Sequence, residues 1–121
     1  MTLHELQEQV RHFARERDWE QFHDPKNLSM ALAGEAGELL EIFQWLTPEQ
    51  SAGIMEDPAR AEAVRHELAD VLAYLLRLAD VLQVDLATAL RAKMLLNAER
   101  YPADQARGRS DKYNRYERQV E

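Results

Sequence analysis

The sequence predicts an all-α protein that forms one four-helix bundle. The 121 residues are 45% hydrophobic and include only 4 Gly and 4 Pro. They are also rich in Ala, Leu and Glu, which favours helices over sheet. Apolar residues recur at helical spacing in four segments, and each segment begins at a recognisable capping residue. We therefore expect a helical domain over residues 1–102 and a polar C-terminal tail over residues 103–121.

The first two helices have clear start signals. Thr2 with Glu5 forms a capping-box pattern, and the helix that it begins is predicted to end near residue 17. Asp24-Pro25 is typical of a cap followed by proline at the first helical position, and this second helix continues to about Trp45.

Two glycines lie inside the second predicted helix, at positions 34 and 37. Each costs up to about 1 kcal/mol relative to alanine. Close approach of another helix or a ligand is the usual reason to tolerate such glycines, and we expect one here.

The second half of the chain repeats these signals. Thr47-Pro48 predicts a short turn that reaches Met55, and Asp57-Pro58 begins the longest helix, from residue 59 to about 82. Asp85 caps a fourth helix over residues 86 to about 100, which Pro102 ends. Four side chains of this helix are predicted to face inward: Leu86, Leu90, Met94 and Leu95. The tail that follows has few apolar residues, and we expect it to be extended or partly disordered.

Charge and composition exclude several classes of function. The net charge of −7 argues against a nucleic-acid partner, which would need a basic surface. The absence of cysteine excludes disulfides and thiolate metal sites. No leader-like start and no apolar run of about 18 residues occurs, so we expect a soluble, cytoplasmic protein without a membrane partner. A nucleotide stays possible, because metal ions can bridge a triphosphate to an acidic pocket.

Acidic residues occur at two places where a helix should be apolar. Glu35 lies in the same helical direction as Leu39 and Ile42, and Glu38 flanks this stripe. Glu67 and Asp70 form a second acid-x-x-acid pair on the apolar face of the longest helix. Carboxylates that face a core are costly unless a cation meets them.

Two such helices, packed antiparallel, would bring four carboxylates around one space. Oxygen ligands alone favour Mg²⁺, or Mn²⁺, and such a site suits hydrolysis of a phosphoanhydride. Three other interpretations stay open: solvated or salt-bridged structural acids, a di-iron carboxylate bundle, and a helical adaptor without chemistry. The di-iron class needs Glu-x-x-His motifs on two helices, whereas the one such pattern, Glu20 to His23, precedes a helix start.

Several segments together resemble the MazG-like all-α nucleoside triphosphate pyrophosphatases, and more narrowly their dCTP pyrophosphatase branch. They include residues 19–23 (WEQFH), 34–38 (GEAGE), 43–45 (FQW) and 67–74 (ELADVLAY). The resemblance continues through Lys93-Met94, Asn97, residues 100–102 and Lys112-Tyr113, and it covers nearly the whole chain.

The resemblance implies a helical bundle that assembles as a homodimer or homotetramer. It implies Mg²⁺ held by Glu35, Glu38, Glu67 and Asp70, with Glu38 as the base, and cleavage of a nucleoside triphosphate to the monophosphate and pyrophosphate. Glu41 continues the three-residue spacing and is either an additional ligand or a solvated side chain. The implied substrate is dCTP or a modified pyrimidine deoxynucleotide.

The resemblance also implies residues that bind the nucleotide. Those that would contact the base or lie near it are Trp19, Phe22, His23 and Trp45, and Tyr74, on the helical face of Glu67, would also contact the substrate. Those that would contact sugar and phosphate are Lys93, Asn97, Arg100, Lys112 and Tyr113, the last two contributed by a tail that closes over the site. For Lys93 and Arg100, ordinary surface charge is an equal alternative. One departure from the family pattern is Val10, which stands where better-known members carry histidine, so the preference for cytosine is open.

Overall fold

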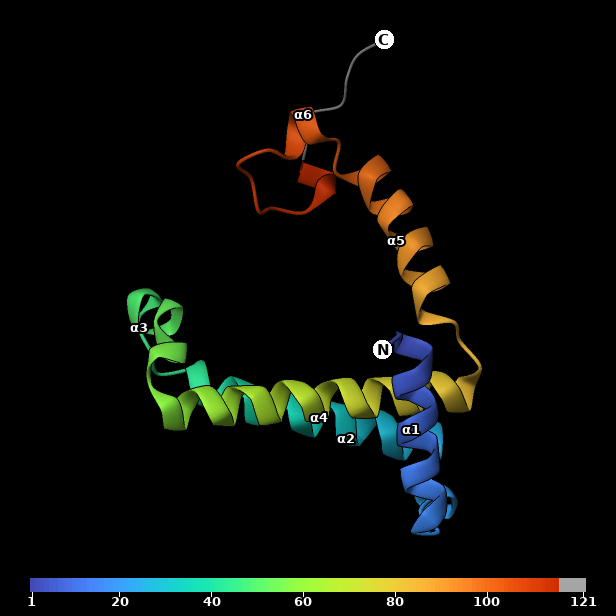
Figure 1. Cartoon of the computed structure of the whole chain (residues 1–121). Helices are drawn as coiled ribbons and strands as arrows, with labels where there is room; N and C mark the ends of the chain where they lie inside the picture. Colours follow the sequence, from blue (N-terminus) through green and yellow to red (C-terminus); the bar gives the residue numbers. More distant parts are fainter. Residues whose placement is uncertain (116–121) are drawn as a thin grey trace. The chain divides into compact units, whose positions relative to one another are not determined.

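The computed structural model describes residues 1–115, and its regular elements are helical throughout, as predicted (Figure 1). The α-helices are α1 (Leu3–Glu16), α2 (Pro25–Phe43), α3 (Pro48–Ala52), α4 (Pro58–Leu82), α5 (Leu86–Arg100) and α6 (Ala103–Ala106). Short 3₁₀ turns are η1 (Glu20–Phe22), η2 (Ile54–Glu56) and η3 (Tyr113–Arg115). The chain groups into two compact units, which divide between Val84 and Asp85. The four-helix bundle and the domain division at residue 102 stay predictions.

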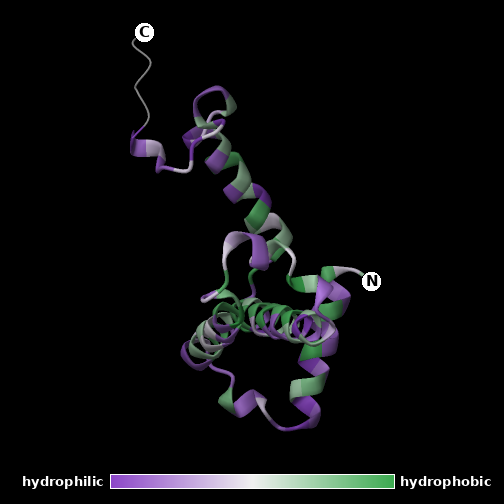
Figure 2. Cartoon of the chain, turned by 90° about the vertical axis from the view of Figure 1, so that its left-hand side faces the viewer, coloured by the Kyte–Doolittle hydropathy of each residue, from purple (hydrophilic) through white to green (hydrophobic). Residues whose placement is uncertain are grey.

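The first unit is built on two long antiparallel helices. Helix α4 packs chiefly against α2 and then against α1, which crosses the pair (Figure 1). Leu28 of α2 and Leu76 of α4 are fully buried, and smaller side chains such as Ala14 and Ala61 fill the remaining core. Figure 2, a view close to the axes of α2 and α4, shows hydrophobic residues concentrated where these helices meet. The shared interface thus fixes which faces of α2 and α4 oppose one another.

Caps explain where the helices begin. Thr2 accepts a hydrogen bond from the Glu5 backbone and Glu5 bonds back to Thr2, which confirms the predicted capping box. Asp24, Asp57 and Asp85 cap α2, α4 and α5 by accepting hydrogen bonds from backbone N–H groups of the first turn, without a reciprocal bond. Side-chain acceptors satisfy backbone N–H groups that no helical carbonyl reaches.

Three local predictions need correction. Helix α2 ends at Phe43, two residues before the predicted end. The expected extended tail instead contains α6 and η3, and its residues 116–121 lie outside the described residues. Leu90, Met94 and Leu95 of α5 are exposed and do not face inward. The reason lies in α5 itself, because its apolar residues are spread around the helix and do not form one buried face.

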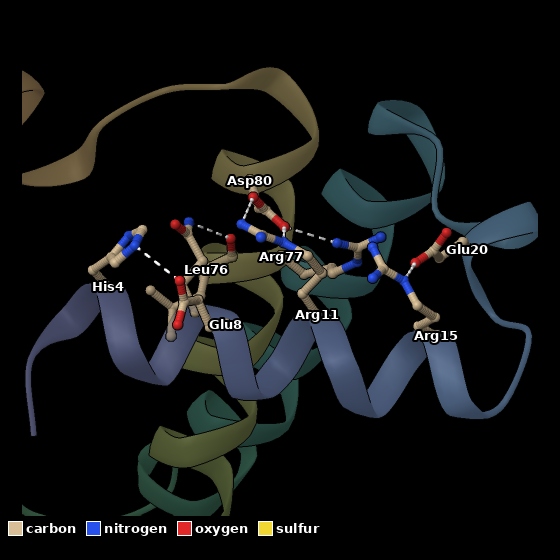
Figure 3. Close-up of polar contacts among 9 residues, drawn as sticks. His4, Glu8, Arg11, Arg15, Glu20, Leu76, Arg77 and Asp80 are labelled. Carbon is tan, nitrogen blue, oxygen red and sulfur yellow. Dashed lines mark hydrogen bonds and ion pairs between the residues drawn. The ribbon is translucent and has the colours of Figure 1, made fainter.

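A polar cluster fastens α1 to α4 (Figure 3). The Arg11 guanidinium binds both carboxylate oxygens of Asp80, with Nε to Oδ2 at 2.7 Å and Nη2 to Oδ1 at 2.6 Å. Gln7 donates from Nε2 to the backbone oxygen of Leu76 at 3.0 Å. Bidentate arginine contacts fix geometry as well as charge, so this cluster sets the crossing of the two helices.

No helix within residues 1–115 has the length and apolar character needed to cross a membrane.

The glycines of α2 provide a test of how the helix is used. A Cβ atom added at Gly34 or Gly37 would meet nothing within 4 Å, so the chain itself supplies no close neighbour there. The expected close approach by another helix is therefore not found within residues 1–115.

We predict that Gly34→Ala raises the free energy of unfolding by about 0.5–1 kcal/mol, because alanine is the better helix former and space is available. Denaturant unfolding measures this change, and Ala36→Gly on the same exposed stretch is the matched control, with an effect of opposite sign. If Gly34→Ala instead lost stability, or if the mass of its assembly in solution differed from that of the wild type, a second chain would be shown to approach α2 at this point.

Candidate functional site

Three of the four predicted acids come together where α2 and α4 pack. Glu35, Glu38 and Glu67 each offer one carboxylate oxygen, and these oxygens lie within 4.8 Å of one another. Asp70 stands one turn beyond Glu67 on α4, and its charge acts on both Glu35 and Glu67. The antiparallel packing thus brings the acid pair of α2 together with Glu67 of α4, while Asp70 lies close enough for its charge to act on the cluster.

Two oxygens of this cluster are buried without a hydrogen-bond partner in the described chain. They are Oε2 of Glu35 and Oε2 of Glu67. Burial, followed by the neighbouring carboxylates Glu38, Glu67 and Asp70, raises the pKa of Glu35 to about 7. Burial also raises the pKa of Glu67, assisted by the charges of Glu38 and Asp70. Buried carboxylates that repel one another need a proton or a cation between them.

The donor set fits a hard divalent cation. All four side chains offer carboxylate oxygen, and neither histidine nor cysteine joins the cluster within residues 1–115. Mg²⁺ and Mn²⁺ prefer such oxygen ligands. A cation would also give the two unpartnered oxygens of Glu35 and Glu67 the interaction that the chain does not supply.

An apolar cavity of about 200 Å³ lies beside the acids. Asp70 and Tyr74 of α4 line it, so the cavity and the acidic cluster share a wall. The other lining residues are Val10, Phe13, Ala14, Trp19, His23, Ala73 and Arg77. The Trp19 ring meets Phe13 edge to face at 5.7 Å between centroids, and it meets His23 in the same manner at 6.4 Å. Ring-lined cavities of this size accept a small planar ring more readily than a large ligand.

Some predicted nucleotide-binding residues do not line this cavity. Phe22 lies in η1 and is 59% exposed, and Trp45 lies beyond the end of α2 and is 86% exposed. Lys93, Asn97 and Arg100 lie on α5 in the second unit, with Lys112 and Tyr113 farther along it. Within that unit, the Arg100 guanidinium lies 4.9 Å from the centre of the Tyr113 ring. Nucleotide binding by these residues stays a prediction.

The sequence interpretation missed Arg77 and Phe13 as lining residues. Arg77 is buried in the apolar middle of α4, and Asp80 follows it by three residues. An Arg-x-x-Asp pair inside a stretch that is otherwise apolar was the available signal. Val10, the departure from the family pattern, also lines the cavity, so the residue exchanged there is one that a bound ring would meet.

The acidic cluster predicts an unusual pH dependence for the metal-free protein. The pKa of Glu35 is raised from 4.5 to about 7 in the fold, so the folded state holds this proton more tightly than the unfolded chain does. The free energy of unfolding of metal-free protein should therefore fall as pH rises from 4.5 through about 7. Added Mg²⁺ should restore stability at the upper end, because it binds the deprotonated carboxylates of the folded state.

Thermal unfolding across this pH range, with and without Mg²⁺, measures the effect. Glu35→Gln should show a weaker pH dependence and a smaller gain from Mg²⁺. Glu62→Gln, an exposed acid of α4 that approaches His66, is the control and should behave as the wild type. Equal pH dependence in wild type and Glu35→Gln would contradict the assignment of the proton to this cluster.

The chain is similar to known proteins in sequence and in fold. Residues 31–115 match the model of the MazG-like family. Over 112 residues, 93% of this chain, the sequence is 48% identical to human dCTP pyrophosphatase 1 and 46% identical to the Bos taurus protein of that name. The match spans 66% of the length of each of these relatives.

A solved structure is also similar. It is a pyrophosphatase from Archaeoglobus fulgidus, with a TM-score of 0.76 and 40% identity. The match covers 82% of this chain and 91% of that structure.

Proposed function

Since this chain belongs to the MazG-like family, we propose that it hydrolyses nucleoside triphosphates to the monophosphate and pyrophosphate with Mg²⁺, or Mn²⁺, as cofactor. One observation carries the proposal. Glu35, Glu38 and Glu67 meet between α2 and α4, two of their buried oxygens lack a hydrogen-bond partner within residues 1–115, and Asp70, one turn beyond Glu67, lines an adjoining aromatic cavity. In a purely structural cluster, burial of these oxygens without a partner would cost free energy that no interaction offsets.

In this proposal each acid has a role. Glu35, Glu38, Glu67 and Asp70 would hold the cation. When bound, it polarises phosphoryl oxygens, offsets developing charge and lowers the pKa of a water ligand. Glu38 would take the proton from the attacking water, and its exposure is consistent with that role because water reaches it. Glu35 and Glu67, more buried, are better suited to holding than to exchanging protons with solvent.

The cavity would receive the base. Trp19 and Tyr74 offer ring faces beside Asp70, and stacking of a base on an aromatic ring contributes about 1–3 kcal/mol. The names of the relatives support dCTP or a modified pyrimidine deoxynucleotide as substrate. Asn97, Lys93 and Arg100, with Lys112 and Tyr113 of the tail, would contact sugar and phosphates, while Trp45 and Phe22 would complete the base site.

Self-association is part of the proposal. Trp45, Leu40, Leu68 and Leu72 are large apolar side chains that the single chain leaves exposed on the first unit. A homodimer or homotetramer would cover them and would give the exposed Trp45 a neighbour.

A cytoplasmic location would place the enzyme with the nucleotide pool. The alternative function is a nucleotide-binding protein without catalysis, which the same cavity would also allow.

The first test concerns the acids. We expect Glu38→Gln to lower kcat by about 10²–10⁴-fold, the usual range for losing a general base. Asp70→Asn should reduce activity and weaken Mg²⁺ binding together. Pyrophosphate release from dCTP is the measurement, circular dichroism verifies folding, and Glu62→Gln again is the control. Folded wild type that releases no pyrophosphate from any nucleoside triphosphate would leave only the binding alternative.

The second test ranks substrates. We expect kcat/KM to be highest for pyrimidine deoxynucleotides, because the cavity is small and ring-lined. A panel of dCTP, 5-methyl-dCTP, dUTP and dTTP, with dATP and dGTP for comparison, measures this preference. Val10→His is the informative variant, since it restores the residue of the family pattern within the cavity and should shift the ranking toward cytosine. Purine substrates that match the pyrimidines would contradict assignment of the base to this cavity.

A further inference from the structure

Arg77 is the charged residue that the first unit buries most completely, with 7% of its surface exposed. It nevertheless lies at the wall of the cavity. Its Nη1 donates to Oδ2 of Asp80 at 3.0 Å, on the carboxylate that Arg11 also binds (Figure 3). Its Nε donates to Nδ1 of His23 at 3.0 Å. The guanidinium therefore links the α1–α4 cluster to a histidine of the cavity.

This contact determines the chemical form of His23. Because Nδ1 accepts a hydrogen bond, it carries no proton, and the neutral ring must hold its proton on Nε2. No group in residues 1–115 forms a hydrogen bond with Nε2. His23 consequently offers one uncommitted N–H donor, whereas Arg77 beside it already donates to Asp80 and to His23.

The surrounding charges keep His23 neutral. Arg11 and Arg77 share the single carboxylate of Asp80, which leaves one positive charge next to the imidazole. Burial lowers the pKa of His23, and the charge of Arg77 lowers it further. The Glu20 carboxylate acts in the opposite direction but is the smaller influence. At neutral pH the ring is thus a donor at Nε2 and is not a cation.

We propose that Arg77 is a positioning residue that holds His23 as the Nε2–H tautomer, so that His23 donates a hydrogen bond to the base of the bound nucleotide. This inference rests on the proposed function, because it assigns the base to the cavity that His23, Trp19 and Tyr74 line. A fixed donor selects a base edge that presents an acceptor, such as the carbonyl oxygen or unprotonated ring nitrogen of cytosine. It disfavours an edge that presents N–H at the same point, because two donors would face each other unpaired.

The first measurement needs no nucleotide. Arg77→Met keeps a long buried side chain and removes the donors, and Arg60→Met, on the exposed first turn of α4, is the matched control. Nitrogen-15 NMR of labelled histidine should show the His23 pKa moving up toward the ordinary value of 6.5 in Arg77→Met and not in Arg60→Met. The Nδ1 resonance should also lose the shift of a hydrogen-bond acceptor. An unchanged pKa and an unchanged Nδ1 resonance in Arg77→Met would overturn the pairing.

The second measurement tests the link to the base. Arg77→Met should weaken dCMP binding in calorimetry, and raise KM for dCTP, about five- to tenfold with little change in kcat, as expected for one lost hydrogen bond. His23→Gln, which can keep an N–H donor near the same position, should retain most of the affinity. In a His23→Gln background, Arg77→Met should add little, because its effect passes through His23. An equal loss with and without His23 would show that Arg77 acts by another route.

The outcomes separate this inference from the proposed function. Wild type that hydrolyses dCTP while Arg77→Met binds dCMP equally well would overturn the inference alone. Wild type that neither hydrolyses dCTP nor binds dCMP would overturn both. If Arg77→Met fails to fold, Arg77→Lys retains a charge for Asp80 but lacks the guanidinium fork, and the same readouts apply to it.

Discussion

The antiparallel packing of α2 against α4 is the constraint on which the candidate site depends. It buries Leu28 and Leu76. At the same interface, the carboxylates of Glu35 and Glu38 lie close to that of Glu67. Apolar burial along the rest of the interface supplies the stability, so the carboxylates are held together despite their repulsion. Because the carboxylates repel one another, a divalent cation that binds between them is a suitable ligand for this part of the fold.

The two charged clusters of the first unit differ in whether their polar atoms have partners. The acids of α2 and α4 include two buried oxygens without partners in the described chain. Around Asp80, by contrast, two guanidiniums and one carboxylate satisfy one another with bonds of 2.6–3.0 Å. The satisfied cluster fixes how α1 crosses α4, and the unsatisfied one remains open to a ligand. A fold can thus combine a rigid support with a reactive centre on the same long helix.

The cavity lies between these two clusters and takes a wall from each. Asp70 brings the negative side, and Arg77 brings the positive side beside the neutral ring of His23. A nucleotide has matching ends, since its phosphates need cations and its base needs ring faces with directed hydrogen bonds. In the proposed function, the phosphates and the base would therefore contact different walls of the cavity, and Val10 lies on the part that the base would meet.

Local signals in the sequence determined most of the secondary structure. The caps at Thr2, Asp24, Asp57 and Asp85 and the helical periodicity predicted the long helices within two residues at their ends. Both depend on residues three or four positions apart, which a single sequence displays directly. The acids were found for the same reason, because a carboxylate on an apolar stripe is visible from spacing alone.

Only the tertiary structure decided which distant residues meet. His23 and Arg77 are 54 positions apart, and Gln7 reaches Leu76 across 69. Neither pairing leaves a periodic trace, since it depends on how α1 and the turn before α2 cross α4. The sequence alone therefore determined the helices and their acidic pairs, whereas the cavity and the state of its histidine arise from long-range packing.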